Sequence, residues 1–258
     1  MDKPRKHLVI PDTQIKPGVP IDHIDWISKY AVEKTPDVIV IIGDWADMPS
    51  LSSYDVGTKS FEGRTYRADI LAANDAPQRL MAPIQVEVAR REKAHRPRWN
   101  PRKIVTLGNH ENRIPRAVEM DRKIDGLISE KDIFFEQWGF EVYPFLQPVV
   151  VDGVAYCHYF VSGQMGRPVT SARMLLQKHH MSCFAGHQQG RDIAYAKRAD
   201  GSRITGIIAG SCYLHDEPYL NAQSNEVWRG VYMLHEVNNG SFDEMPVSLT
   251  FLKEKYGQ

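Results

Sequence analysis

The sequence predicts an α/β fold, because short runs of β-branched residues alternate with a segment of helical periodicity. The runs 7–10 and 38–42 are almost entirely apolar, and between them apolar residues recur from Ile21 to Ala31 at helical spacing. Apolar runs without polar alternation suit strands that are buried on both faces, as in sheets covered by helices. The chain is therefore expected to begin with a strand, a helix and a second strand.

Two further predicted strands end in polar loops. The runs 103–107 and 182–185 are each followed by glycine and then by polar residues, Gly108-Asn109-His110-Glu111 in one case and Gly186-His187 in the other. In open α/β sheets, ligands bind where the carboxyl ends of strands meet. This pattern predicts that side chains from separate loops converge on one site.

Residues 45–102 interrupt this rhythm. The part from about 67 to 95 is expected to be helical, with Pro77 and Pro83 as its main breakers, and the segment 90–103 contains seven Lys or Arg and one Glu. This basic segment has two interpretations, either a solvated helix end with a turn or a phosphate-binding patch beside an active site. In the second case Trp99 would be available to stack on a base.

The second half of the chain reads as β-rich. Hairpins are expected at 149–157, around Asp152-Gly153, and at 191–208, with a helix at 171–179 between them. We also expect strands at 211–214, 231–237 and 247–251.

Composition excludes several classes of protein. The 258 residues are 42% hydrophobic and contain 32 basic and 32 acidic side chains, so disorder and a general nucleic-acid coat are not expected. We expect neither a secretory leader nor a transmembrane helix, because the sequence has no apolar run of about 18 residues. Its three cysteines form no CxxC pair. We expect a cytoplasmic protein without membrane contact, folded as one domain over 1–258 with a helical, partly basic insertion at about 48–100.

The polar loops carry side chains that bind divalent metals. Carboxylate and amide oxygens suit hard cations, and imidazole suits borderline ones. In chain order the candidate residues are Asp12, Gln14, Asp44, Asp47, Asn109, His110, His158, His187 and Gln189.

Taken in order, these residues resemble the motifs of the calcineurin-like metallophosphoesterase superfamily, namely D-x-H, G-D-x-x-D, G-N-H-E, a lone His and G-H-x-H. The resemblance covers about residues 7–190, and the downstream part is similar to compact phosphoesterases of bacteriophages and prophages. It implies a four-layer sandwich of two mixed β-sheets flanked by helices. It also implies hydrolysis of a phosphoester by a metal-bound hydroxide, with two divalent ions.

The resemblance also implies a role for each residue. Asp44 would bridge the two metals, and the remaining ligands would be Asn109, His158 and His187 at one ion and Asp12, Gln14 and Gln189 at the other. His110 would assist the leaving group, and Asp47 would orient His110.

The family pattern has histidine where this chain has Gln14 and Gln189, and both changes fall on the same metal. A glutamine carbonyl is a harder and weaker ligand than imidazole. We therefore expect the Asp12/Gln14/Gln189 site to bind more weakly, with Mn²⁺ as the leading candidate and Mg²⁺, Zn²⁺ or Fe as alternatives. Both glutamines could instead form local hydrogen bonds only, and His158 could be a core histidine.

A phosphate substrate also favours a cation beyond the metals, for which Arg113 and then Arg191 are the candidates. The substrate could be a monoester or a diester, with nucleic acid or a nucleotide favoured slightly by the basic segment. Two other functions stay open, an inactive metal-binding scaffold and a nucleic-acid-binding module that uses the basic insertion. The sequence leaves the oligomeric state open.

Overall fold

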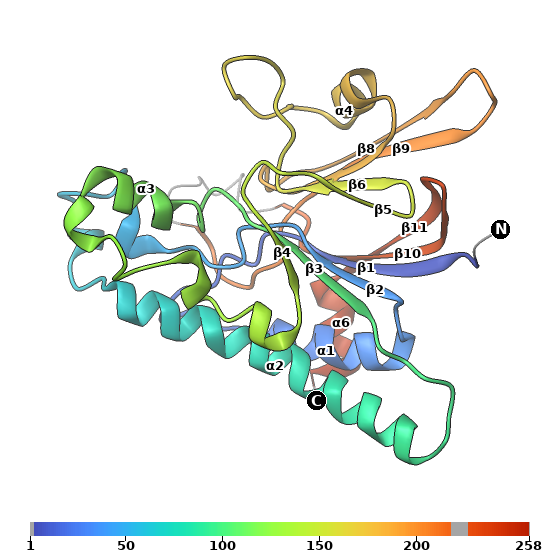
Figure 1. Cartoon of the computed structure of the whole chain (residues 1–258), viewed down its shortest axis with the longest axis horizontal. Helices are drawn as coiled ribbons and strands as arrows, with labels where there is room; N and C mark the ends of the chain where they lie inside the picture. Colours follow the sequence, from blue (N-terminus) through green and yellow to red (C-terminus); the bar gives the residue numbers. More distant parts are fainter. Residues whose placement is uncertain (1–2, 218–226, 258) are drawn as a thin grey trace.

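The computed structural model of the chain describes residues 3–217 and 227–257, which form two mixed sheets with helices on their outer faces (Figure 1). The strands are β1 (Arg5–Ile10), β2 (Val38–Ile41), β3 (Arg102–Thr106), β4 (Glu141–Tyr143), β5 (Val149–Val151), β6 (Val154–Cys157), β7 (Ser182–Ala185), β8 (Arg191–Lys197), β9 (Arg203–Ala209), β10 (Gly230–Asn238) and β11 (Ser241–Ser248). The α-helices are α1 (Asp22–Lys34), α2 (Tyr66–Lys93), α3 (Arg113–Met120), α4 (Ala172–His179) and α6 (Leu249–Tyr256). Short 3₁₀ helices lie at Pro49–Leu51, Lys59–Phe61, Arg122–Ile124, Glu130–Asp132 and Glu136–Trp138.

The two sheets share a mixed topology. The first has the order β11-β10-β1-β2-β3-β4, in which β1 to β4 are parallel and β10 and β11 are antiparallel. The second has the order β5-β6-β7-β9-β8, in which β6, β7 and β9 are parallel and the outer strands are antiparallel. Because five of the parallel strands are followed by the polar loops, both sheets direct these loops toward one edge.

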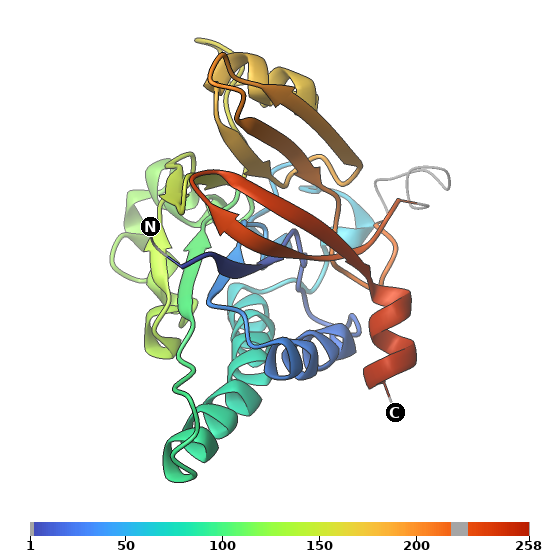
Figure 2. The same ribbon diagram turned by 90° about the vertical axis from the view of Figure 1, so that its right-hand side faces the viewer.

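The order of the layers can be seen from where the side chains of each strand pack. Val38 and Val40 of β2 pack between the sheets, whereas Ile39 and Ile41 pack with the helices on the outer face of the first sheet. The helices α1, α2 and α6 cover that face, and α4 covers the second sheet (Figures 1 and 2). The observed architecture is thus the expected four-layer α/β sandwich of two mixed sheets flanked by helices.

Helix α2 is continuous over 28 residues although it contains Pro77 and Pro83. A proline inside a helix cannot donate a hydrogen bond to the carbonyl four residues earlier. For Pro77 that carbonyl belongs to Ala73, and the indole of the buried Trp45 donates to it at 3.2 Å. The loop after β2 thus satisfies an acceptor that the proline leaves open.

The prediction of a strand at 247–251 is wrong over most of its length. Strand β11 ends at Ser248, and α6 begins at Leu249. The Ser248 hydroxyl caps this helix by accepting a hydrogen bond from the Phe251 amide at 3.2 Å. Leu249 and Leu252 are buried and Phe251 is exposed, which is helical spacing that the short apolar run concealed. Residues 211–214 also form no strand, only an isolated bridge at Ser211.

The basic segment 90–103 does not lie beside the polar loops. It ends α2 and leads into the amino end of β3, whereas the polar loops follow the carboxyl ends of the strands (Figure 1). Trp99 is buried, donates from its indole to the Pro36 carbonyl at 2.7 Å and lies under Arg91. The expectation that Trp99 could stack on a base is therefore wrong, because packing against the sheet already occupies its ring.

Within the described residues, the structure has no helix that is both long and apolar enough to cross a bilayer.

Candidate metal centre

Residues from both sheets converge at the edge where the parallel strands end. Asp12, Asp44 and Asn109 follow β1, β2 and β3 of the first sheet, and His158 and His187 follow β6 and β7 of the second. The interface between two sheets thus brings together side chains that are up to 175 residues apart in the chain.

One group of these residues has the geometry of a metal site. Single ligand atoms of Asp44, His158 and His187 lie within 4.8 Å of one another. The Asn109 Oδ1 lies 2.9 Å from His158 Nε2 and 2.8 Å from His187 Nδ1, so it adds an oxygen to the same space. Carboxylate, imidazole and amide donors are together suited to a divalent transition metal.

The tautomer of His158 favours metal binding. Its Nδ1 lies 3.0 Å from the Ile42 carbonyl, which can only accept, so Nδ1 carries the proton. In the neutral ring Nε2 then presents its lone pair to Asn109 and Asp44. A carbonyl that fixes the tautomer of a ligating histidine is typical of metal sites.

A second group, Asp12, Gln14 and Gln189, adjoins the first. The Gln14 Nε2 lies 3.2 Å from Asp44 Oδ2, and the Gln189 Nε2 lies 3.5 Å from Asp12 Oδ2. The Oε1 atoms of both glutamines are buried and have no hydrogen-bond partner among the described residues. Buried acceptors without partners are costly, and a cation beside these carboxylates would satisfy both. The two groups therefore fit two divalent ions.

The charges of this centre are strongly coupled. Burial, with the nearby Asp44 charge, raises the pKa of Asp12 to about 7, although His158 and the His187 amide oppose this. Burial also acts to raise the pKa of Asp44, but His110 and His158 outweigh it and lower that pKa overall. Burial acts to lower the pKa of His158, but the charge of Asp44 outweighs it and raises the pKa to about 9.

The backbone at the centre is unusual. Gln14, Asp44, His187 and Gln189 all have positive φ, between 46° and 70°. Such conformations are uncommon for residues other than glycine and tend to gather at functional sites. The adjoining glycines are required by close packing, because a Cβ at Gly108 would lie 2.1 Å from Asp44 Oδ1.

Glu111 holds the two loops of the first sheet together. Its side chain is fully buried and accepts from the amides of Gly108 at 2.7 Å, Ala46 at 2.8 Å and Asp44 at 3.1 Å. Its role is thus structural.

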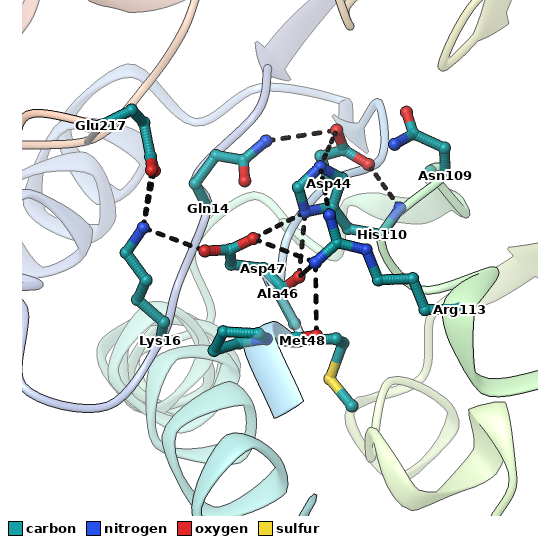
Figure 3. Close-up of polar contacts among 12 residues, drawn as sticks. Gln14, Lys16, Asp44, Ala46, Asp47, Met48, Asn109, His110, Arg113 and Glu217 are labelled. Atoms are coloured by element: carbon teal, nitrogen blue, oxygen red, sulfur yellow. Dashed lines mark hydrogen bonds and ion pairs between the residues drawn. The ribbon is translucent and has the colours of Figure 1, made fainter. Parts of the chain in front are cut away.

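His110 lies at the rim of the centre and faces Asp44 (Figure 3). Its Nδ1 lies 2.8 Å from Asp47 Oδ1 and 2.9 Å from the Asp47 carbonyl, so Nδ1 donates and Nε2 is directed toward Asp44 Oδ2 at 3.8 Å. Burial acts to lower the pKa of His110, but Asp44 and the hydrogen bond to Asp47 outweigh it and raise the pKa. The ring is therefore held with one nitrogen available to a ligand.

Arg113 lies beside His110, from the first turn of α3. Its guanidinium donates to the Asp47 carbonyl at 2.7 Å and the Met48 carbonyl at 3.3 Å, and Nη2 is 3.4 Å from His110 Nε2. Arg191, the other expected cation, lies elsewhere. Its guanidinium is over the rings of Trp228 at 5.1 Å and Tyr232 at 5.9 Å, and it does not line the cavity described next.

A cavity of about 760 Å³ opens in front of the centre. Asp44, Asn109 and His187 of the centre line this cavity, and residues 49–69 also contribute to its lining, with Tyr54 and Arg64 among them. The first part of the expected insertion thus borders the site, whereas the rest of α2 runs away from it along the first sheet (Figure 1).

Sequence reasoning missed Lys16 and Glu217, which line the same cavity. Lys16 Nζ lies 2.9 Å from Asp47 Oδ2 and 2.7 Å from Glu217 Oε2 (Figure 3). The one sequence signal for Lys16 was its spacing, because Asp12, Gln14 and Lys16 stand at every second position. Glu217 had none, because only the fold brings its segment to this edge.

The comparisons with known proteins are distant. Neither a family model nor a curated protein sequence matches the chain. Among solved structures, the one described as YfcE, a phosphoesterase from E. coli, has 15% identity and a TM-score of 0.40, with 95% of this chain and 99% of that chain covered. Another has 10% identity and a TM-score of 0.45, with 95% and 100% covered. Likenesses this distant carry no conclusion about activity, so the function has to be argued from the geometry of the centre.

Proposed function

We propose that the protein is a metal-dependent hydrolase of phosphoesters. The observation that carries this proposal is the paired ligand arrangement around Asp44, with the orphaned oxygens of Gln14 and Gln189 on one side and the Asn109 amide on the other. Two adjacent divalent ions would supply an activated water and neutralise charge on the phosphoryl group.

The chain's own residues would bind the substrate and hold a proton. His110 Nε2 is directed into the cavity while Asp47 holds Nδ1, so His110 is placed to donate a proton to the oxygen of the leaving group. Arg113 lies within reach of the same space and would bind a non-bridging phosphate oxygen. Asp47 orients both groups through its carboxylate and its carbonyl.

Mn²⁺ is the proposed ion at both positions, with weaker binding at the Asp12/Gln14/Gln189 group. Two neutral amide oxygens replace imidazoles there, and such oxygens favour Mn²⁺ or Mg²⁺ over Zn²⁺. The nucleic-acid-binding alternative has no support at this edge, because the basic segment lies at the far end of β3 and Trp99 is buried. The scaffold alternative does not account for a histidine held by Asp47 toward the cavity.

The test removes metal with EDTA and restores Mn²⁺, Mg²⁺ or Zn²⁺ separately. Hydrolysis of p-nitrophenyl phosphate and of bis(p-nitrophenyl) phosphate is then measured for the wild type, Asp44→Asn and His110→Asn. A matched control is His180→Asn, an exposed histidine at the end of α4 with positive φ, which asparagine tolerates.

Turnover that depends on metal and is lost in Asp44→Asn but kept in His180→Asn would support the proposal. Full activity in His110→Asn would contradict the role of His110. Absence of turnover with every ion would favour the scaffold.

A further inference from the structure

Lys16 lies between the carboxylates of Asp47 and Glu217, and the proposed function gives it no role. Its Nζ lies 2.9 Å from Asp47 Oδ2, 2.8 Å from Glu217 Oε1 and 2.7 Å from Glu217 Oε2. The side chains of Lys16, Asp47 and Glu217 are only 15%, 10% and 1% exposed. Three segments, after β1, β2 and β9, thus meet at one ammonium group (Figure 3).

The two oxygens of Asp47 have separate partners. Oδ1 accepts from His110 Nδ1 at 2.8 Å, and Oδ2 accepts from Lys16 Nζ at 2.9 Å. A carboxylate held at one oxygen only can rotate about its terminal torsion, which has a broad energy minimum. The contact with Lys16 therefore fixes the plane in which Asp47 meets His110.

The charges favour a cation at the position of Lys16, beside the contact of Glu217 with His215 Nε2 at 2.7 Å. Glu217 is almost fully buried, and a buried carboxylate is costly unless it is paired. Burial acts to raise the pKa of Glu217, while His215 and Lys16 lower it overall. Without Lys16, the two carboxylates would face each other across the space that the ammonium group fills, and Asp47 would turn away from Glu217.

We propose that Lys16 is a positioning residue, clamped by Glu217, that holds Asp47 so that His110 directs Nε2 at the oxygen of the leaving group. This inference rests on the proposed function. Lys16 also lines the cavity, so the competing role is direct binding of the substrate phosphate, which the test must separate.

The kinetic test compares p-nitrophenyl phosphate, which has a good leaving group, with phenyl phosphate, which has a poor one. A positioned acid matters most for the poor leaving group. We expect Lys16→Met to lower kcat for phenyl phosphate roughly 10²-fold and to lower it much less for p-nitrophenyl phosphate, with KM unchanged. Adding Lys16→Met to His110→Asn should cause no further loss, since both changes disable one unit.

Controls address stability and unrelated lysines. Lys16→Met takes the ammonium group away from Glu217, which keeps its contact with His215 Nε2 at 2.7 Å. Lys16→Met/Glu217→Gln therefore serves as a charge-balanced variant that should show the same loss for phenyl phosphate. Lys253→Met, at an exposed position of α6, should behave as the wild type. A raised KM with unchanged kcat would overturn the positioning role in favour of substrate binding, and additive losses in the double variant with His110→Asn would also overturn it.

A second measurement is independent of turnover. In metal-free protein, long-range ¹H–¹⁵N spectra should show the same His110 Nδ1 chemical shift in the wild type and in Lys253→Met. In Lys16→Met this shift should change, because Nδ1 keeps the Asp47 carbonyl at 2.9 Å but loses the fixed contact with the Asp47 carboxylate. An unchanged His110 spectrum in Lys16→Met would overturn the inference. If no variant hydrolyses any ester but the spectra change as expected, the proposed function fails while the positioning contact stands.

Discussion

Replacing Glu111 should destabilise the protein by an amount that follows from its three hydrogen bonds. The carboxylate accepts at Oε1 from the Ala46 amide and at Oε2 from the amides of Gly108 and Asp44. Hydrogen bonds to a charged group contribute about 1.5–3 kcal/mol each, and a buried donor left without a partner costs a similar amount. Glu111→Ala orphans all three donors, and three bonds at the lower end of this range give an expected loss of about 4.5 kcal/mol in the free energy of unfolding.

Glu111→Gln is the more informative change. The amide oxygen can take the place of Oε2 and keep two bonds, but the amide nitrogen then faces the Ala46 N–H, and two donors meet. Burial and the charge of Asp44 raise the pKa of Glu111, so a neutral side chain also relieves some repulsion. The net loss should be about 2 kcal/mol.

The assay is urea denaturation followed by circular dichroism, with Glu119→Gln on the exposed side of α3 as the control. The control should stay within about 0.5 kcal/mol of the wild type. If Glu111→Gln is equally unaffected, the carboxylate does not hold the two loops together, and the reasoning is refuted. Because the same bonds hold Asp44, Mn²⁺ affinity should fall together with stability.

Three further predictions concern acid stability, close packing and metal preference. Burial lowers the pKa of His7 from 6.5 to about 4. Between these two pH values His7 is protonated in the unfolded chain but not in the folded protein. The free energy of unfolding should therefore fall by up to about 3 kcal/mol as the pH drops through this window. In His7→Gln the midpoint of urea denaturation should fall less steeply with pH than in the wild type. Parallel plots of midpoint against pH for the two proteins would contradict this. Gly108→Ala should reduce Mn²⁺ binding and turnover roughly 10²-fold, because the new Cβ would overlap Asp44 Oδ1. Gly163→Ala should change neither, because a Cβ there would have no atom within 4 Å. Unaltered Mn²⁺ binding in Gly108→Ala, measured by calorimetry, would refute the packing argument. Gln14→His and Gln189→His should each tighten Zn²⁺ binding in competition with a chelator, since imidazole is the softer ligand, and unchanged Zn²⁺ stoichiometry and affinity would count against a metal beside these residues.

The sequence by itself determined the elements that carry the candidate site. The short apolar runs predicted β1, β2, β3 and β7, and the glycine and polar residues after them predicted that the loops would converge. Local patterns suffice here because a strand buried on both faces must be apolar throughout, and because a turn that places a ligand needs glycine or a short polar residue. The apolar run at 247–251 misled, since over five residues a capped helix and a strand bury the same residue types.

The tertiary structure alone decided what each polar residue contacts. Residues 90–103 and Lys16 show this most clearly. The basic segment looked suited to phosphate but lies at the amino end of β3, and its Trp99 is used in packing. Lys16 gave little sign of function, yet it meets Glu217 from 201 residues further along the chain. A sequence shows which residues carry charge, but not which charged side chains contact each other. Those contacts depend on the order of the strands and on burial, and both are set by long-range contacts between the two sheets.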